Sequence, residues 1–161
     1  LHDALPISAR YINLVLLLVI FKSKKWQING AVLGSAILFA LPHIGNAFAS
    51  ELKQTPLATA FQVIDTFGFG CFAAVLILYS GKLWPTMVIH ALYDILTFSE
   101  TPLTQDGVGI FGGNIGSLIH VIISLVLWVS FAAFLLIKNR KLIKQNVQIL
   151  TRVQKTDLTI S

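Results

Sequence analysis

Long apolar runs separated by short polar stretches dominate the chain. The runs cover residues 11–21, 29–49, 57–80, 83–98 and 114–137. A helix needs about 20 apolar residues to cross a bilayer, so the second, third and fifth runs are long enough, whereas the first and fourth are shorter. The pattern predicts an all-α fold, a polytopic membrane helical bundle of about four to five transmembrane segments.

The two ends of the chain differ from this bundle. Residues 1–8 resemble translated sequencing adapter and contain no initiator Met, so we interpret them as a non-native leader. Residues 9–137 form the expected bundle, which includes one long loop at residues 99–113. Residues 138–161 form a basic polar tail, expected to be helical at first and then frayed, without an apolar face that packs.

Composition supports a membrane location. Hydrophobic residues make up 55% of the chain, charged residues only 12%, and the mean hydropathy is +0.78. In soluble domains about a quarter of all residues are charged, which is far more than in this chain. The chain is therefore expected to be an integral membrane protein with the lipid bilayer as a partner. The net charge of +5 is explained by loop lysines and anionic lipid headgroups, and it does not indicate nucleic acid binding.

Loop charges predict an orientation. Most basic loop residues follow the odd-numbered runs, namely Lys22, Lys24, Lys25, Lys82 and the group at 138–141. The loops after the even-numbered runs carry Glu51, Lys53, Glu100 and Asp106. Because basic loops stay in the cytoplasm, the amino-terminal end is predicted to lie outside and the tail inside.

Two histidines lie within apolar runs, and each has a notable residue one helical turn away. Phe39 precedes His43 by four positions, and His90 precedes Asp94 by four. Positions i and i+4 share a helix face, so each pair is expected to lie side by side. Ionisable groups at membrane depth are costly and usually face the bundle interior, which predicts one shared polar pocket.

Three further polar residues are predicted to lie at the same membrane level as His43 and Asp94. They are Arg10, Asp65 and His120. Each has a plainer interpretation. Arg10 is also typical of an interfacial anchor, and His120 of a hydrogen bond between helices. Asp65 is interpreted as pairing locally with Thr66 or Gln62, with pocket lining as the alternative.

The motifs resemble those of a known family. Phe39-x-x-x-His43, the segment Gly-Lys-Leu-Trp-Pro at 81–85, and His90-x-x-x-Asp94 occur in the order seen in the CPBP family. This family comprises the CAAX prenyl proteases of type II and the bacteriocin-processing Abi proteins. The resemblance extends over about residues 10–98 and implies an intramembrane endopeptidase acting on a peptide or protein substrate in a cell membrane, here interpreted as bacterial.

The resemblance also implies catalytic roles. His43 and a glutamate of the first motif would activate water, His90 would donate to the oxyanion, and Asp94 would assist His90 or stay protonated. Phe39 would restrict the rotamer of His43, and Arg10 would be the arginine of the first motif, Glu-Glu-x-x-x-Arg.

The two glutamates of that motif would occupy positions 5 and 6, where this chain has Leu5 and Pro6. The chain as given is therefore expected to lack its general base and to be inactive.

No cofactor is predicted, with metal dependence left open. Two alternatives remain. Two histidines and an aspartate are acceptable zinc ligands, which allows a metal-binding membrane enzyme or transporter. The other alternative is a non-catalytic membrane protein of the same fold, such as a bacteriocin immunity or regulatory factor.

Overall fold

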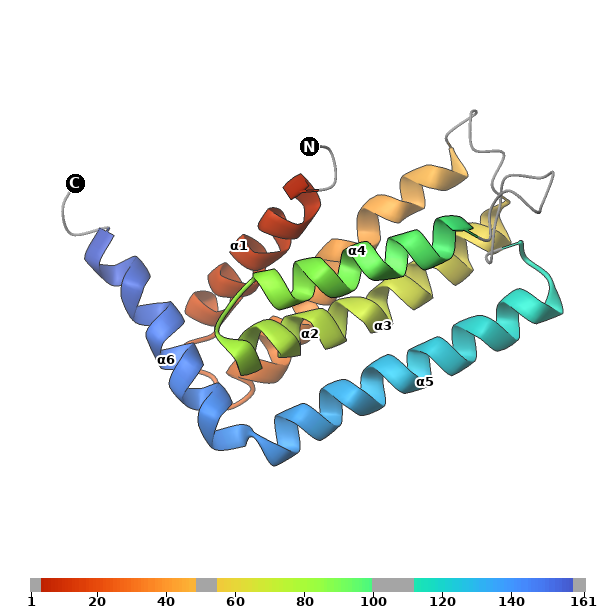
Figure 1. The fold of residues 1–161 in the computed structure, drawn as a ribbon. Coiled ribbons are helices and arrows are strands. Elements are labelled where there is room, and N and C mark those ends of the chain that lie inside the picture. Colours follow the sequence, from red (N-terminus) through yellow and green to blue (C-terminus); the bar gives the residue numbers. More distant parts are fainter. Residues whose placement is uncertain (1–3, 49–54, 100–111, 158–161) are drawn as a thin grey trace.

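The computed structural model describes residues 4–48, 55–99 and 112–157, and the regular structure in these ranges is helical (Figure 1). The elements in chain order are α1 (Ala4–Ile20), α2 (Gln27–Ala40), the 3-10 helix η1 (Leu41–Ala47), α3 (Pro56–Ser80), α4 (Trp84–Ser99), α5 (Ile115–Lys138) and α6 (Arg140–Asp157). The predicted all-helical fold is confirmed. The loop expected at 99–113 lies almost entirely outside the described residues.

Within the part of the chain that the structure describes, three helical segments are long and apolar enough to cross a membrane: Gln27–Ala47, Pro56–Ser80 and Ile115–Lys138. The apolar part of α1 is shorter, and α4 has 16 residues. Large apolar side chains cover the exposed face of α5, namely Ile119, Ile122, Ile123, Val126 and Leu127. Such a face is suited to hydrocarbon rather than water, so the chain is an integral membrane helical bundle.

Helix α3 lies at the centre of the bundle, where it contacts α1, α2, α4, α5 and α6 (Figure 1). Its N-cap is Thr55, whose side-chain oxygen accepts from the backbone N–H of Ala58, and its C-cap is Gly81 at φ +67°. A Cβ on Gly70 would lie 3.1 Å from the Cα of Ala36, so α2 and α3 approach closely through small residues. This approach brings the end of α2 against the middle of α3.

The sequence presents residues 29–49 as one apolar run, but the structure divides this run between two types of helix. The α-helix ends at Ala40, and the chain continues as η1 with Pro42 in its first turn. Proline lacks the N–H that an α-helix interior requires, which favours a change of helix type at this point. Asn46 Nδ2 donates to Gln62 Oε1 at 2.8 Å and ties η1 to α3.

The tail differs from its prediction. Residues Arg140–Asp157 form α6, which buries Ile143 and Val147 in the main core, so the expectation of no packable apolar face was wrong. Asn146 Nδ2 donates to the carbonyl oxygens of Leu78 and Tyr79, both at 2.9 Å. These carbonyls belong to the last turn of α3, where backbone acceptors lack helical partners. Helix α6 is therefore docked against the end of the bundle.

Candidate active site

Arg10 of α1 is buried in an unusual environment for a cation. Its side chain is 2% exposed, and its Cζ lies 3.3 Å from the centroid of the Phe39 ring and 5.3 Å from that of Phe69. The three guanidinium nitrogens are buried without a hydrogen-bond partner within the described residues. Contact with aromatic faces stabilises the charge only in part, so the site is suited to an additional anion.

The ring of Phe39 brings the two predicted histidines together. Its centroid lies 5.7 Å from that of His43 and 6.0 Å from that of His90, both in edge-on geometry. His43 comes from η1 and His90 from α4, which are separated in the chain by the whole of α3. The two imidazoles therefore lie at one aromatic ring, with Arg10 stacked on the same ring.

Asp94 completes this group. Its Oδ2 lies 3.5 Å from His90 Nε2, and the two side chains are 38% and 17% exposed. Arg10 and His43 both lie within electrostatic range of the Asp94 carboxyl group. We call Arg10, Phe39, His43, His90 and Asp94 the central cluster. It contains two imidazoles and one carboxyl group beside a buried cation, which is the composition that general acid-base chemistry uses.

Asp65 lies one layer deeper. It is 1% exposed, and its carboxylate accepts hydrogen bonds from Tyr93 Oη at 2.5 Å and from Ser124 Oγ. These partners are on α4 and α5, so the expected local pairing with Thr66 or Gln62 was wrong. Asp65 joins three helices through one carboxylate, and it thereby holds α4 in place beside the central cluster.

Phe69 connects the Asp65 network to the central cluster. Its ring stacks on Tyr93 with centroids 5.4 Å apart and lies 5.4 Å from the His90 ring. Trp128 of α5 packs edge-on against Phe69 at 5.2 Å. An aromatic wall therefore fixes one side of His90.

Sequence reasoning missed Tyr93, Phe69, Ser124 and Trp128. Tyr93 had a local signal, because it lies three positions after His90 and shares its helix face. The other three have no motif or spacing that distinguishes them from ordinary core residues. Only helix packing shows that they support the cluster.

His120 lies near the start of α5, beside Val121, which forms a small buried pair with Phe61. Its role as pocket lining stays a prediction. Among the described residues there is no group of three or more His, Cys, Asp or Glu side chains that could hold a metal ion.

Comparison with protein-family models shows which family the chain belongs to. Residues 12–96, just over half of the sequence, match the family model described as type II CAAX prenyl endopeptidase Rce1-like. The chain belongs to this family. The match covers Phe39, His43, His90 and Asp94 and begins two residues after Arg10. No curated protein and no solved structure matches the chain.

Proposed function

We propose that the protein, with both glutamates of the first family motif in place, is an intramembrane endopeptidase of a bacterial cell membrane. Membership of the Rce1-like family supports peptide or protein hydrolysis at the level of the family. The single observation that carries the more specific proposal is the central cluster, in which Arg10 has no hydrogen-bond partner among the described residues while His43 and His90 share the ring of Phe39.

In the proposed reaction, a motif glutamate and His43 activate a water molecule. The glutamate accepts a proton as the water oxygen adds to the scissile carbonyl carbon. His90 donates a hydrogen bond to the oxyanion that forms. Collapse of this intermediate breaks the C–N bond, and the glutamate returns the proton to the leaving amine. The products are a carboxylate and an amine, and no other reactant is needed.

Asp94 is the proposed positioning residue for His90. Its 3.5 Å approach to Nε2 is long for a hydrogen bond, but such bonds often tighten when substrate binds. Phe39 is proposed to limit the rotamers of both histidines, because its ring packs against each imidazole in edge-on geometry.

Arg10 explains what the glutamates would contribute. Positions 5 and 6 belong to α1, and position 6 is one turn before Arg10 on the same helix face. A carboxylate there would supply a charge partner for the buried guanidinium. With Leu5 and Pro6 at these positions, we propose that the chain is inactive.

The test is to restore both carboxylates with the double substitution Leu5→Glu/Pro6→Glu. The variant is reconstituted in vesicles with a library of hydrophobic and prenylated peptides, and cleavage is detected by mass spectrometry. The matched control, Leu5→Gln/Pro6→Gln, keeps the size and polarity but removes the general base. General base catalysis typically contributes about 10²–10⁴-fold, so the Glu variant is expected to cleave at least about 100 times faster than the Gln variant.

In the restored background, His43→Ala and His90→Ala are expected to abolish cleavage, whereas Phe39→Leu leaves measurable turnover. Asp94→Asn distinguishes two roles: retained activity identifies a hydrogen-bonding partner, and loss identifies a required charge. Insensitivity of the activity to chelators would separate this mechanism from a metal-dependent one. Equal cleavage by the Glu and Gln variants would show that the site lies elsewhere.

A second function is favoured by one observation, which is the presence of Leu5 and Pro6 at the glutamate positions. If these residues are native, the protein is a non-catalytic member of the family, with an immunity or regulatory role. The genomic sequence upstream of Arg10 distinguishes the two cases directly.

A further inference from the structure

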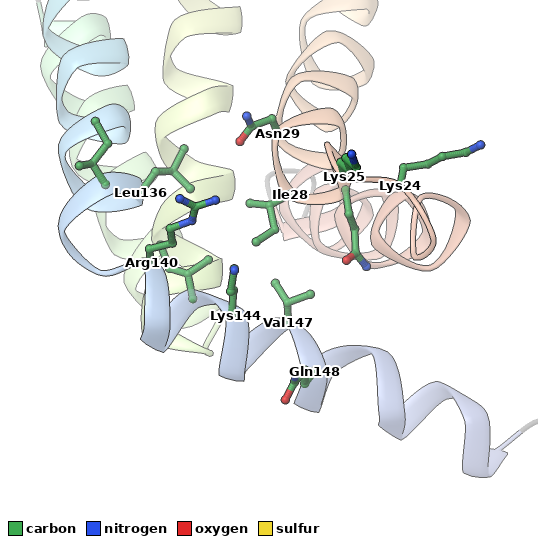
Figure 2. A pocket seen from close by; sticks show the side chains of 12 residues that line it. Lys24, Lys25, Ile28, Asn29, Leu136, Arg140, Lys144, Val147 and Gln148 are labelled. Atoms are coloured by element: carbon green, nitrogen blue, oxygen red, sulfur yellow. The ribbon is translucent and has the colours of Figure 1, made fainter.

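A cavity of about 560 Å³ lies between α6, the end of α5 and the start of α2 (Figure 2). Among the described residues, four cations line it and no acidic side chain does; the cations are Lys24, Lys25, Arg140 and Lys144. Its volume falls within the range of cavities that bind small molecules. The cavity is therefore large enough for a ligand, and its charge selects an anion.

The cations of α6 are directed into this space. Figure 2 shows Arg140 and Lys144 extending from α6 toward α2, whereas Lys24 extends away. The two α6 cations are four positions apart on one helix face, where like charges repel each other. An anion between them would remove this repulsion. Without a bound anion, the repulsion between Arg140 and Lys144 therefore remains.

The cavity also has an apolar wall, which a free anion would not use. Ile28 and Leu136 are half-buried in it, and Ile143 and Val147 are buried beneath it. Ile137, which lines the same cavity, is 79% exposed. Cations beside apolar side chains match a phosphate group attached to hydrocarbon, as in a phospholipid.

The position of the cavity agrees with this ligand. It lies where α5 ends and α2 begins, so it is at the basic end of the spanning segments, which is predicted to face the cytoplasm. Basic pockets between membrane helices on this side commonly bind anionic lipid headgroups. Its α6 wall is fixed, because Asn146 holds α6 to the end of α3.

We propose that this cavity binds one anionic phospholipid, with the phosphate held by Arg140 and Lys144 and the upper acyl chains against Ile28 and Leu136. The lipid would fill the gap between α6 and the start of α2 and secure α6 on the bundle. This site is at the other end of the spanning helices from His43. Its occupancy does not depend on peptide cleavage.

The test is native mass spectrometry of the detergent-solubilised protein with phosphatidylglycerol and with phosphatidylcholine of identical acyl chains. One phosphatidylglycerol is expected to bind in preference to phosphatidylcholine. Each cation near an anionic headgroup contributes roughly a fivefold effect, so Arg140→Gln/Lys144→Gln is expected to weaken binding about 25-fold. The matched control is Lys138→Gln/Lys141→Gln, which removes the same charge from residues that do not line the cavity and should retain binding.

Three outcomes would overturn the proposal. Equal binding of the two lipids would show that the headgroup charge is not recognised. Equal loss in the two double variants would indicate a general charge effect. Displacement of the lipid by an equal concentration of inorganic phosphate would indicate a site for free anions. Arg140→Lys/Lys144→Arg is the control for misfolding, because it changes the same two residues but keeps both charges. This variant must still bind the lipid.

Discussion

The hydroxyl of Tyr93 provides a direct test of how α4 is held in the bundle. It donates to Asp65 Oδ2 at 2.5 Å, and Ser124 donates to the other oxygen of the same carboxylate. Tyr93→Phe removes one donor while keeping the ring stacked on Phe69. The substitution therefore isolates the hydrogen bond from the aromatic packing.

The expected cost follows from two competing magnitudes. A hydrogen bond to a charged group contributes about 1.5–3 kcal/mol. Hydrogen bonds between membrane helices average about 0.6 kcal/mol and reach about 1.7 kcal/mol, because the unfolded chain finds other partners in the bilayer. Asp65 is 1% exposed and the bond is short, so the upper end of the membrane range applies. We expect Tyr93→Phe to lower the free energy of unfolding by about 1.5 kcal/mol.

The measurement is reversible unfolding in mixed micelles, with helicity as the signal. Tyr79→Phe is the matched control, because Tyr79 is also half-buried on a helix and its hydroxyl makes no hydrogen bond among the described residues. Its effect should stay within about 0.5 kcal/mol. Equal effects of the two substitutions would refute the Asp65 network. A double variant with Ser124→Ala should show a non-additive loss, since both hydroxyls share one carboxylate.

Three other predictions concern packing, charge and orientation. Gly70→Ala places a methyl group against the α2 backbone and should lower the free energy of unfolding by about 1–3 kcal/mol. The control is Gly45→Ala, whose added Cβ would meet nothing within 4 Å and should not destabilise the protein in the same assay. Arg10→Met should stabilise the present chain by about 1–3 kcal/mol but destabilise the restored Glu variant by about 3–5 kcal/mol; the same sign in both backgrounds would contradict the charge argument. A cysteine at Thr104, with the native cysteine replaced, should react with an impermeant reagent in intact cells if the loop lies outside, as the lysines indicate, and protection would reverse the orientation.

The sequence by itself determined the class of fold and part of the candidate site. Apolar run length predicts membrane helices, because hydrocarbon thickness sets the number of residues that a span requires. Spacing by four places Asp94 beside His90 and Phe39 near His43, since helical geometry fixes neighbours along one element. The second pair kept this relation even though the α-helix gives way to a 3-10 helix between its members.

Only the tertiary structure decided which helices pack together and so which site residues meet. It brought Arg10 and His90 to the same aromatic ring, that of Phe39. It also gave Asp65 partners on α4 and α5, and docked α6 on the end of α3. Periodicity identifies the face of a helix that is buried, but the partner of that face depends on shape and on close approaches such as that of Gly70 to Ala36. For the same reason the basic residues of α6 could be counted from the sequence, whereas the cavity that gathers them exists only because Ile143 and Val147 are packed into the core.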